Sequence, residues 1–361
     1  RSALAANTTA SNNVAVGKSA LLANTTGASN TAIGALSLEA NTTADNNTGV
    51  GLSSLRANTT GASNTAVGRL ALRTNTTAAN NTAVGDASLA LNTTGANNTA
   101  VGGSAMAANT TGGTNVAVGQ SALGANTTAS NNTAMGYNAL GANTTGANNV
   151  AVGRLTLDAN TTASNNTAVG DSALTANTTG YSNTAVGVDA SRSNTDGFRN
   201  TALGQLALQT TTTGDGNIAI GYNAISTSAT ANGQCTLGSS LITNLRCNDT
   251  TISSISDSRD KTNIIDSPYG LDFINTVRPV QFKWETRDGN AKDGSTRIGF
   301  LAQELLAATD GNNAVLDLVL DDNPERLEAK YGNLLPILVK AIQEQNALIE
   351  ALTTRITTLE G

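Results

Sequence analysis

A strict 17-residue repeat governs residues 1–225 of this chain. The residue before each repeated glycine is Val, Ile, Leu or Met, and the residue four places after it is Leu in ten of thirteen units. Asn stands four places before every one of these glycines, and another Asn follows seven places after the glycine in eleven units. The glycines succeed one another without insertion or deletion at positions 17, 34, 51, 68, 85, 102, 119, 136, 153, 170, 187, 204 and 221. A length held this constant indicates units that stack in a fixed register.

The residues of the unit predict a β-solenoid in which each 17-residue unit forms one coil. The segment "NTAVG" alternates polar and apolar residues, as a half-buried strand does, and "SALLA" is a second short apolar stretch that we expect to form another strand. The segments "NTTG" and "ASN" hold residues that favour turns. Helical repeats need longer units of about 33–47 residues. With a rise of about 4.8 Å per coil the repeat would form a rod of roughly 60 Å, in which stacked Asn side chains form amide ladders.

A single coil of this composition buries little apolar surface. Aromatic residues make up only 3% of the chain, so the core depends on a column of Val and a column of Leu. We therefore expect several chains to associate along an apolar column, with the small residues beside the Leu allowing close approach.

The composition changes sharply near residue 234. Residues 1–234 hold 8 Lys or Arg and 8 Asp or Glu, whereas residues 235–361 hold 12 and 18. The second part also contains the only Trp, Trp284, and all four Pro. This shift predicts a domain boundary.

We divide the chain into a β-roll at residues 1–231, a connector at 232–255 and a charged domain at 256–361. The connector is rich in Thr and Ser and alternates with apolar residues, so it resembles strands, which three chains could share, or a loosely ordered linker. It contains Cys235 and Cys247, too few for a disulfide framework. The two cysteines pair if neighbouring strands bring them together and otherwise remain free thiols.

Several classes of function conflict with the composition. The net charge of −6 disfavours a partner bound through nucleic-acid phosphates. No apolar run approaches the roughly 20 residues that span a membrane, so we expect no membrane insertion. We also expect no metal and no cofactor. The chain begins at Arg1 rather than Met, and we expect an N-terminal attachment region to precede it.

The segment "SISDSRDKTNI" concentrates charge where the repeat has ended. The chain contains no His, which excludes every Ser–His or Cys–His nucleophile. Lys is the recognised substitute base, and it works when desolvation or a nearby cation lowers its pKa. Ser256 and Lys261 lie five residues apart, so a turn could join them, with Arg259 as the nearby cation. From the residues alone the dyad pattern is weak, and a solvated charged turn is the favoured interpretation of the segment.

Four ordered segments resemble the intramolecular chaperone autoprocessing domain, peptidase family S74, of phage tail spikes and fibres. The first carries the pattern Ser-Asp-x-Arg-x-Lys-x-x-Ile from Ser256 to Ile264. The others are "LDFINTVRPVQFKW" at 271–284, "IGFLAQEL" at 298–305 and the Tyr and Leu-Leu-Pro that open 331–352. The resemblance implies a small α+β domain that trimerises, aligns the fibre chains while they fold and then cuts itself off.

The same resemblance implies roles for individual residues. Ser256 would be the nucleophile that attacks the carbonyl carbon of Ile255, so that cleavage falls between these two residues. Lys261 would be the general base, and Asp257 and Arg259 would shape the site. The reaction would be a single-turnover self-cleavage with no other catalytic activity. An oxyanion donor is required, but the sequence does not identify it.

The repeat resembles the head of trimeric autotransporter adhesins of the YadA type. The segment "NTAVG" at 64–68, with Ala71 and Leu72, is similar to the motif of that family. The resemblance implies a mainly β fold, a left-handed parallel β-roll in which three chains lie side by side.

The end of the chain, from about residue 333, is predicted to form a trimeric coiled coil. Seven residues follow the 4-3 spacing of a heptad seam, and all but Gln345 are apolar: Leu338, Ile342, Gln345, Ile349, Leu352, Ile356 and Leu359. The alternative is an amphipathic helix packed on its own domain. A trimeric C-terminal domain would act as a clamp that fixes the register of three chains. Such a clamp is needed because nearly identical coils can align out of register by 17 residues at little cost.

The sequence therefore predicts a homotrimeric phage tail fibre or spike, located on the virion tail or otherwise extracellular, that attaches to an unknown host-cell receptor. One alternative is a bacterial trimeric surface adhesin. Another is a solenoid that binds ice or carbohydrate through ladders of Thr such as Thr25 and Thr26. The "NTT" segments are also formal N-glycosylation acceptors.

Overall fold

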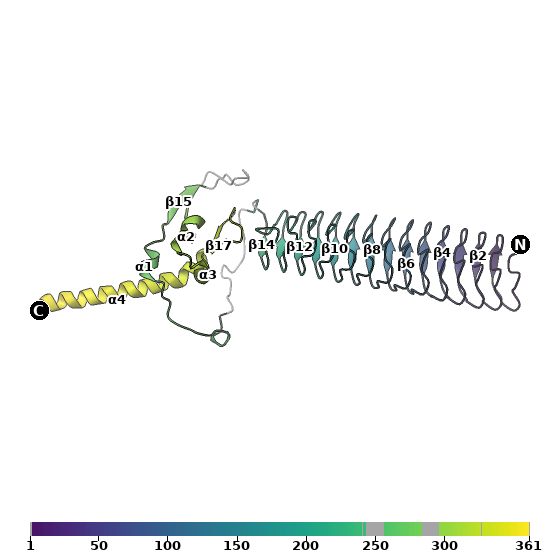
Figure 1. The fold of residues 1–361 in the computed structure, drawn as a ribbon, viewed down its shortest axis with the longest axis horizontal. Helices are drawn as coiled ribbons and strands as arrows, with labels where there is room; N and C mark the ends of the chain where they lie inside the picture. Colours follow the sequence, from purple (N-terminus) through teal and green to yellow (C-terminus); the bar gives the residue numbers. More distant parts are fainter. Residues whose placement is uncertain (1, 240, 243–255, 284–295, 326, 361) are drawn as a thin grey trace. The chain divides into compact units, whose positions relative to one another are not determined.

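The chain divides into two compact units, Arg1–Ser239 and Ser240–Gly361, which are described separately. The first unit is a parallel β-solenoid built from 17-residue coils, as the repeat predicts (Figure 1). The fold class is thus mainly β, with a small α+β region and a terminal helix in the second unit. The structure is a computed structural model, and it describes residues 2–239, 241–242, 256–283, 296–325 and 327–360.

Each coil contributes one three-residue strand to a single parallel sheet. Every strand pairs with the next at a register of one repeat, as Thr65 pairs with Thr82 and Val67 with Val84. The last strand, β14, stacks on β13 in the same register, so the ladder continues to Leu237. The fourteen strands are β1 Val14–Val16, β2 Thr31–Ile33, β3 Thr48–Val50, β4 Thr65–Val67, β5 Thr82–Val84, β6 Thr99–Val101, β7 Val116–Val118, β8 Thr133–Met135, β9 Val150–Val152, β10 Thr167–Val169, β11 Thr184–Val186, β12 Thr201–Leu203, β13 Ile218–Ile220 and β14 Cys235–Leu237.

The middle residue of each strand, which is Ala in twelve of the fourteen, faces the interior, and its two neighbours face outward. In β4, Ala66 is fully buried whereas Val67 keeps 36% of its surface exposed. Leu72 of the same coil is fully buried and packs with the Ala column in one continuous core. The side chains before the glycines therefore form an outward-facing apolar stripe, the valine column, which runs from Val16 to Leu237. Its members contribute to the surface and not to the core.

The second apolar stretch of the coil is a series of turns, and the expectation of a second strand there is wrong for the described coils. In a representative coil, Ser121 has a φ of 57° and Leu123 has a φ of 51°, which lie in the left-handed region and not in the β region. The stretch still stacks, because the Leu123 N–H donates to the Ala139 carbonyl of the next coil at 3.0 Å. Alternating left-handed residues thus turn the Leu side chain inward without a second sheet.

The repeated glycine is required by the closeness of the coils. Gly119 has a φ of 134°, and a Cβ added there would lie 2.4 Å from the backbone oxygen of Gly136. Neither the conformation nor the space admits a side chain. Gly103 directly follows another such glycine but has open space around its Cα, so it is not constrained in this way.

Two ladders of buried Asn confirm the predicted amide stacking. In the first, the Asn126 amide donates to Asn109 Oδ1 at 2.8 Å and to the Ala129 carbonyl at 3.1 Å. In the second, Asn132 donates its backbone N–H to Asn115 Oδ1 at 2.9 Å. The first ladder ends at Asn194, whose Oδ1 is buried without a partner because Thr replaces Asn in the next coil.

The ladders also bear on the "NTT" segments. From Asn24 to Asn177 their Asn side chains are buried in the stack, so these folded coils present no amide nitrogen for glycosylation, whereas Asn7 in the first coil is only partly buried. The first Thr of each segment is also engaged, since the Thr110 hydroxyl donates to the Thr127 carbonyl at 3.0 Å. These Thr hydroxyls serve the stacking of coils, which weakens the interpretation of that column as an ice- or sugar-binding ladder.

The second unit is a small α+β assembly around one apolar cluster. Two antiparallel strand pairs, β15 with β16 and β17 with β18, accompany the helices. The elements are η1 Ser258–Asp260, α1 Leu271–Ile274, β15 Val280–Lys283, β16 Thr296–Gly299, α2 Ala302–Ala308, α3 Asn313–Leu316, β17 Val319–Leu320, β18 Glu328–Ala329, η2 Tyr331–Asn333 and α4 Leu334–Glu360 (Figure 1). Its buried core consists of Leu305, Leu316, Leu318, Val319, Leu334 and Ile337.

Helix α4 is held to this unit by its first turns only. Leu334, Ile337 and Ala341 are its buried residues. Further along, the Glu344 carboxylate accepts the backbone N–H of Leu271 at 2.7 Å and so caps the short helix α1. None of the helices in the described ranges is long and apolar enough to cross a membrane.

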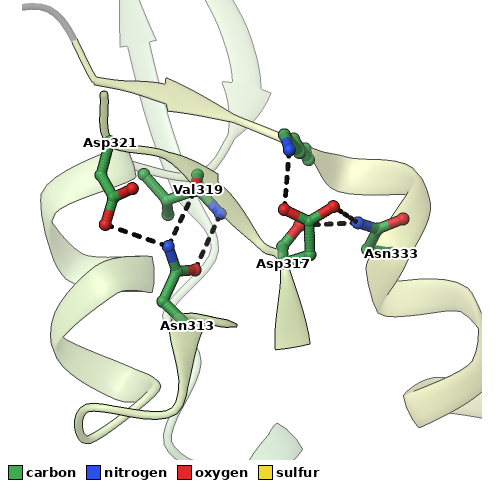
Figure 2. A network of polar contacts seen from close by, with 6 residues as sticks. Asn313, Asp317, Val319, Asp321 and Asn333 are labelled. Carbon is green, nitrogen blue, oxygen red and sulfur yellow. Dashed lines mark hydrogen bonds and ion pairs between the residues drawn. The ribbon is translucent and has the colours of Figure 1, made fainter. Parts of the chain in front are cut away.

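A polar network fixes the segment after α3 (Figure 2). Asn313 donates to the Val319 carbonyl at 2.8 Å and accepts the Val319 N–H at 3.1 Å. Asp317, which ends α3 with a φ of 47°, binds Lys330 Nζ at 2.7 Å and accepts from the Asn333 amide at 3.1 Å. These bonds tie α3 to β17 and to η2, where α4 begins.

Candidate functional site

The candidate site is formed by one tight turn at the start of the charged domain. Asp257 caps η1, because its Oδ1 accepts the Arg259 backbone N–H at 2.9 Å. The Lys261 N–H then donates to the Ser258 carbonyl at 3.3 Å and closes the turn. This fold of the backbone brings residue 256 and residue 261 to the same side.

The turn places the two predicted catalytic side chains in direct contact. Lys261 Nζ lies 2.6 Å from Ser256 Oγ, and both residues are exposed. As an ammonium ion the Lys donates to the hydroxyl and cannot accept its proton. As a neutral amine it would accept the Ser proton across the same contact, which is the geometry a general base needs. The arrangement can therefore generate a nucleophilic oxygen once the Lys loses its proton.

Asp257 and Arg259 form a forked ion pair beside this contact. Arg259 Nε lies 3.0 Å from Asp257 Oδ1, and Arg259 Nη2 lies 2.5 Å from Oδ2. The side-chain hydrogen bonds from Arg259, with help from its backbone N–H, lower the pKa of the Asp257 carboxyl, and the same pair raises the pKa of Arg259. The guanidinium charge is thus balanced by Asp257, so Arg259 acts here as a support for the turn. It does not present a free cation to Lys261.

Ile255, which would supply the attacked carbonyl, lies outside the described residues, as do Cys247 and Trp284. The predicted pairing of Cys235 with Cys247 therefore involves a residue outside the described ranges. Cys235 itself is an exposed free thiol. Within the described ranges there is no group of three or more His, Cys, Asp or Glu that could hold a metal ion.

The later sequence motifs meet in the same unit. Arg278, from the "VRPVQF" segment, donates through Nε to Glu304 of the "AQEL" segment at 3.0 Å. The Tyr331 hydroxyl donates to the Phe300 carbonyl at 3.1 Å, and the two rings meet edge to face with centroids 5.4 Å apart. These contacts join segments separated in sequence, and none of them involves Ser256 or Lys261.

The structure also identifies residues that the sequence did not single out. Glu344, which caps α1, comes from 73 residues further along the chain. Glu344 is one of several charged residues in α4, and its partner is a backbone N–H that no side-chain pattern encodes. Asp317 is a second example, because its role depends on a left-handed backbone at the end of α3.

Comparison with known proteins locates a family within the second unit. Residues 256–316 match the family Peptidase_S74, described as the chaperone of endosialidase. The match begins at Ser256 and ends with α3, before the terminal helix. A search of curated proteins and a search of solved structures found no significant match to the chain. The chain thus joins a parallel β-solenoid of 17-residue coils to an endosialidase-chaperone domain of the Peptidase_S74 family at residues 256–316.

Proposed function

We propose that this chain is a homotrimeric phage tail fibre or spike, located on the virion tail, whose C-terminal domain directs assembly and then cleaves itself off before Ser256. The solenoid would form the shaft or head that attaches to a host-cell receptor. The observation that carries the proposal is the 2.6 Å contact between Lys261 Nζ and Ser256 Oγ at the first residue of the matched domain.

The self-cleavage step follows from the atoms of this pair. Neutral Lys261 takes the hydroxyl proton as Ser256 Oγ forms a bond to the carbonyl carbon of Ile255. The peptide C–N bond then breaks, and the Lys returns the proton to the departing Ser256 nitrogen. Water hydrolyses the resulting ester, which leaves a carboxylate on Ile255 and an amino group on Ser256. Asp257 and Arg259 hold the turn in which this contact forms.

Two exposed apolar surfaces support self-association. The valine column offers an unbroken stripe on the outer face of the solenoid sheet, with Val16 58% and Leu203 47% exposed. The heptad seam of α4 is exposed as well, from Ile342 at 56% to Leu359 at 78%. The residues that pack α4 on its own domain lie on an adjacent face, so the seam is left for other copies.

Intact mass spectrometry tests the cleavage. The full chain should separate into fragments 1–255 and 256–361, and both Ser256→Ala and Lys261→Ala should keep the full-length mass. Ser258→Ala is the matched control, because Ser258 is exposed in the same turn but does not contact Lys261 through its side chain. An uncleaved wild-type chain after long incubation, or cleavage of Ser256→Ala at the same bond, would refute the proposal.

The assembly role is tested by light scattering. The Ser256→Ala chain should be a trimer, because it retains the domain. Deletion of 256–361 should give monomers or mixed, misregistered aggregates, since nearly identical coils do not fix their own alignment. Soluble, uniform trimers from the truncated chain would show that no clamp is needed.

A further inference from the structure

One column of the solenoid surface carries a repeat longer than the coil. The residue directly after each repeated glycine defines the post-glycine column. In ten successive coils, the column residues of the last five coils are identical to those of the first five at four of five places. In order, the column reads Arg69, Asp86, Gly103, Gln120, Tyr137, then Arg154, Asp171, Val188, Gln205, Tyr222. The pattern Arg-Asp-x-Gln-Tyr therefore occurs twice, five coils apart.

The recurrence is stronger in this column than in the variable column five places after the same glycines. Five places after the same glycines, none of the five pairs matches between the same two blocks of coils: Arg73, Ala90, Ala107, Gly124 and Gly141 against Asp158, Thr175, Arg192, Gln209 and Ser226. The fold does not require the recurring residues either, since Ala35 and Leu52 occupy the column in earlier coils. A constraint from outside the coil accounts for a pattern that stacking does not need.

The column is exposed and nearly neutral. Arg69 binds Asp86 at 2.8 Å, and five coils later Arg154 binds Asp171 at 2.9 Å, so each guanidinium is balanced by the carboxylate of the next coil. Each copy of the pattern ends in an exposed Tyr, and Tyr137 and Tyr222 keep 52% and 51% of their surface in solvent.

We propose that the post-glycine column binds an extended, neutral glycan chain that lies along the solenoid axis. A Tyr ring offers an apolar face to the C–H groups of a sugar and a hydroxyl at its rim. The neighbouring Gln, Arg and Asp supply donors and acceptors for sugar hydroxyls. The inference names the receptor class for the attachment function proposed above, but it rests only on the solenoid surface.

Other occupants fit the column less well. A protein partner buries about 800 Å² on each side, whereas this column is one side chain wide and is flanked by the glycines. An anionic polymer needs uncompensated positive charge, and both Arg are paired. The two copies are related by translation along the stack and lie roughly 24 Å apart at about 4.8 Å per coil. A linear chain of repeating units can contact both copies at once.

The experiment uses the full chain carrying Ser256→Ala, probed on an array of neutral oligosaccharides of graded length, with anionic glycans on the same array. We expect retention of neutral chains long enough to span both copies. Tyr137→Ala or Tyr222→Ala alone should weaken binding about 100-fold. A glycan that contacts both copies is held near the second Tyr by the first, and this effective concentration is lost when only one Tyr remains. The double Ala variant should not bind, and the double Tyr→Phe variant should bind, because it keeps the ring faces.

The matched control is Thr128→Ala, at an exposed position nine places after Gly119 and outside the post-glycine column, and it should bind like the parent chain. Circular dichroism checks that every variant folds. The inference is overturned if no neutral glycan is retained, if only anionic glycans are retained, or if the double Ala variant binds as the parent does. Self-cleavage is measured separately by mass in chains with Ser256 intact, so failure of one proposal is distinguishable from failure of the other.

Discussion

Replacing Gly119 by Ala should damage the solenoid far more than replacing Gly103, although both glycines lie on the surface of neighbouring coils. At Gly119 the backbone has a φ of 134°, and the new Cβ would lie 2.4 Å from the Gly136 oxygen and 2.7 Å from its carbonyl carbon. At Gly103 the added atom would meet nothing within 4 Å. The two variants therefore make the same Gly→Ala change, once with a steric clash and once without.

The cost at Gly119 has two parts. Holding a non-glycine residue in that backbone region costs about 1–3 kcal/mol. An ordinary contact needs about 3.4 Å, so the two coils must separate by about 1 Å. That shift stretches the bonds from Gly136 N to Val118 O and from Leu123 N to Ala139 O, now 2.8 and 3.0 Å, at about 1 kcal/mol each. Gly119→Ala should thus destabilise the fold by roughly 4 kcal/mol, and Gly103→Ala by about 0.5 kcal/mol or less.

The measurement is urea unfolding followed by far-ultraviolet circular dichroism of the two variants and the parent chain. A stacked array is coupled mainly between neighbours, so the fault at Gly119 should also broaden the transition and admit protease between the coils on either side. If the two variants have free energies of unfolding within about 1 kcal/mol of each other, the close stacking at the glycine column is not what holds the coils in place.

Three further predictions address the ladder, the turn and the terminal helix. Asn126→Ala removes three hydrogen bonds and leaves a buried acceptor on Asn109, so it should cost about 3 kcal/mol in urea unfolding, whereas the exposed Thr128→Ala should change little. Asp257→Asn should slow self-cleavage by a constant factor between about pH 6 and 9. Because the pKa of Asp257 is lowered, its carboxylate stays charged and paired with Arg259 above the ordinary carboxyl value near 4, and the pair is lost only as the pH falls through the lowered pKa. Cleavage is followed by mass spectrometry over time at each pH. A pH profile that shifts in Asp257→Asn would contradict a purely supporting role for the ion pair. Ile349→Lys should dissociate the proposed trimer in light scattering, and Thr354→Lys, on the opposite face of α4, should not.

Much of the candidate site could be predicted because it is local. Ser256 and Lys261 are five residues apart, and the Asp and Arg between them favour the turn that joins them. The oxyanion donor could not be predicted, because it need not be near in sequence. The contact of Glu344 with the α1 backbone was missed for the same reason. Site residues that lie within one turn can be predicted from the sequence, whereas contacts formed by tertiary packing cannot.

The sequence by itself determined the architecture of the first unit. A 17-residue unit without insertions can bury its apolar residues only by stacking on copies of itself, and an invariant Asn in such a stack bonds to the Asn of the neighbouring coil. What the tertiary structure decided is the direction of each side chain within the coil. Alternation shows that Ala66 and Val67 face opposite ways, but not which of them faces inward. The thin coil resolves this by size: it admits the methyl group of Ala beside Leu72 and leaves the larger Val outside. It also replaces the expected second strand with left-handed turns, which direct the Leu side chain into the narrow core.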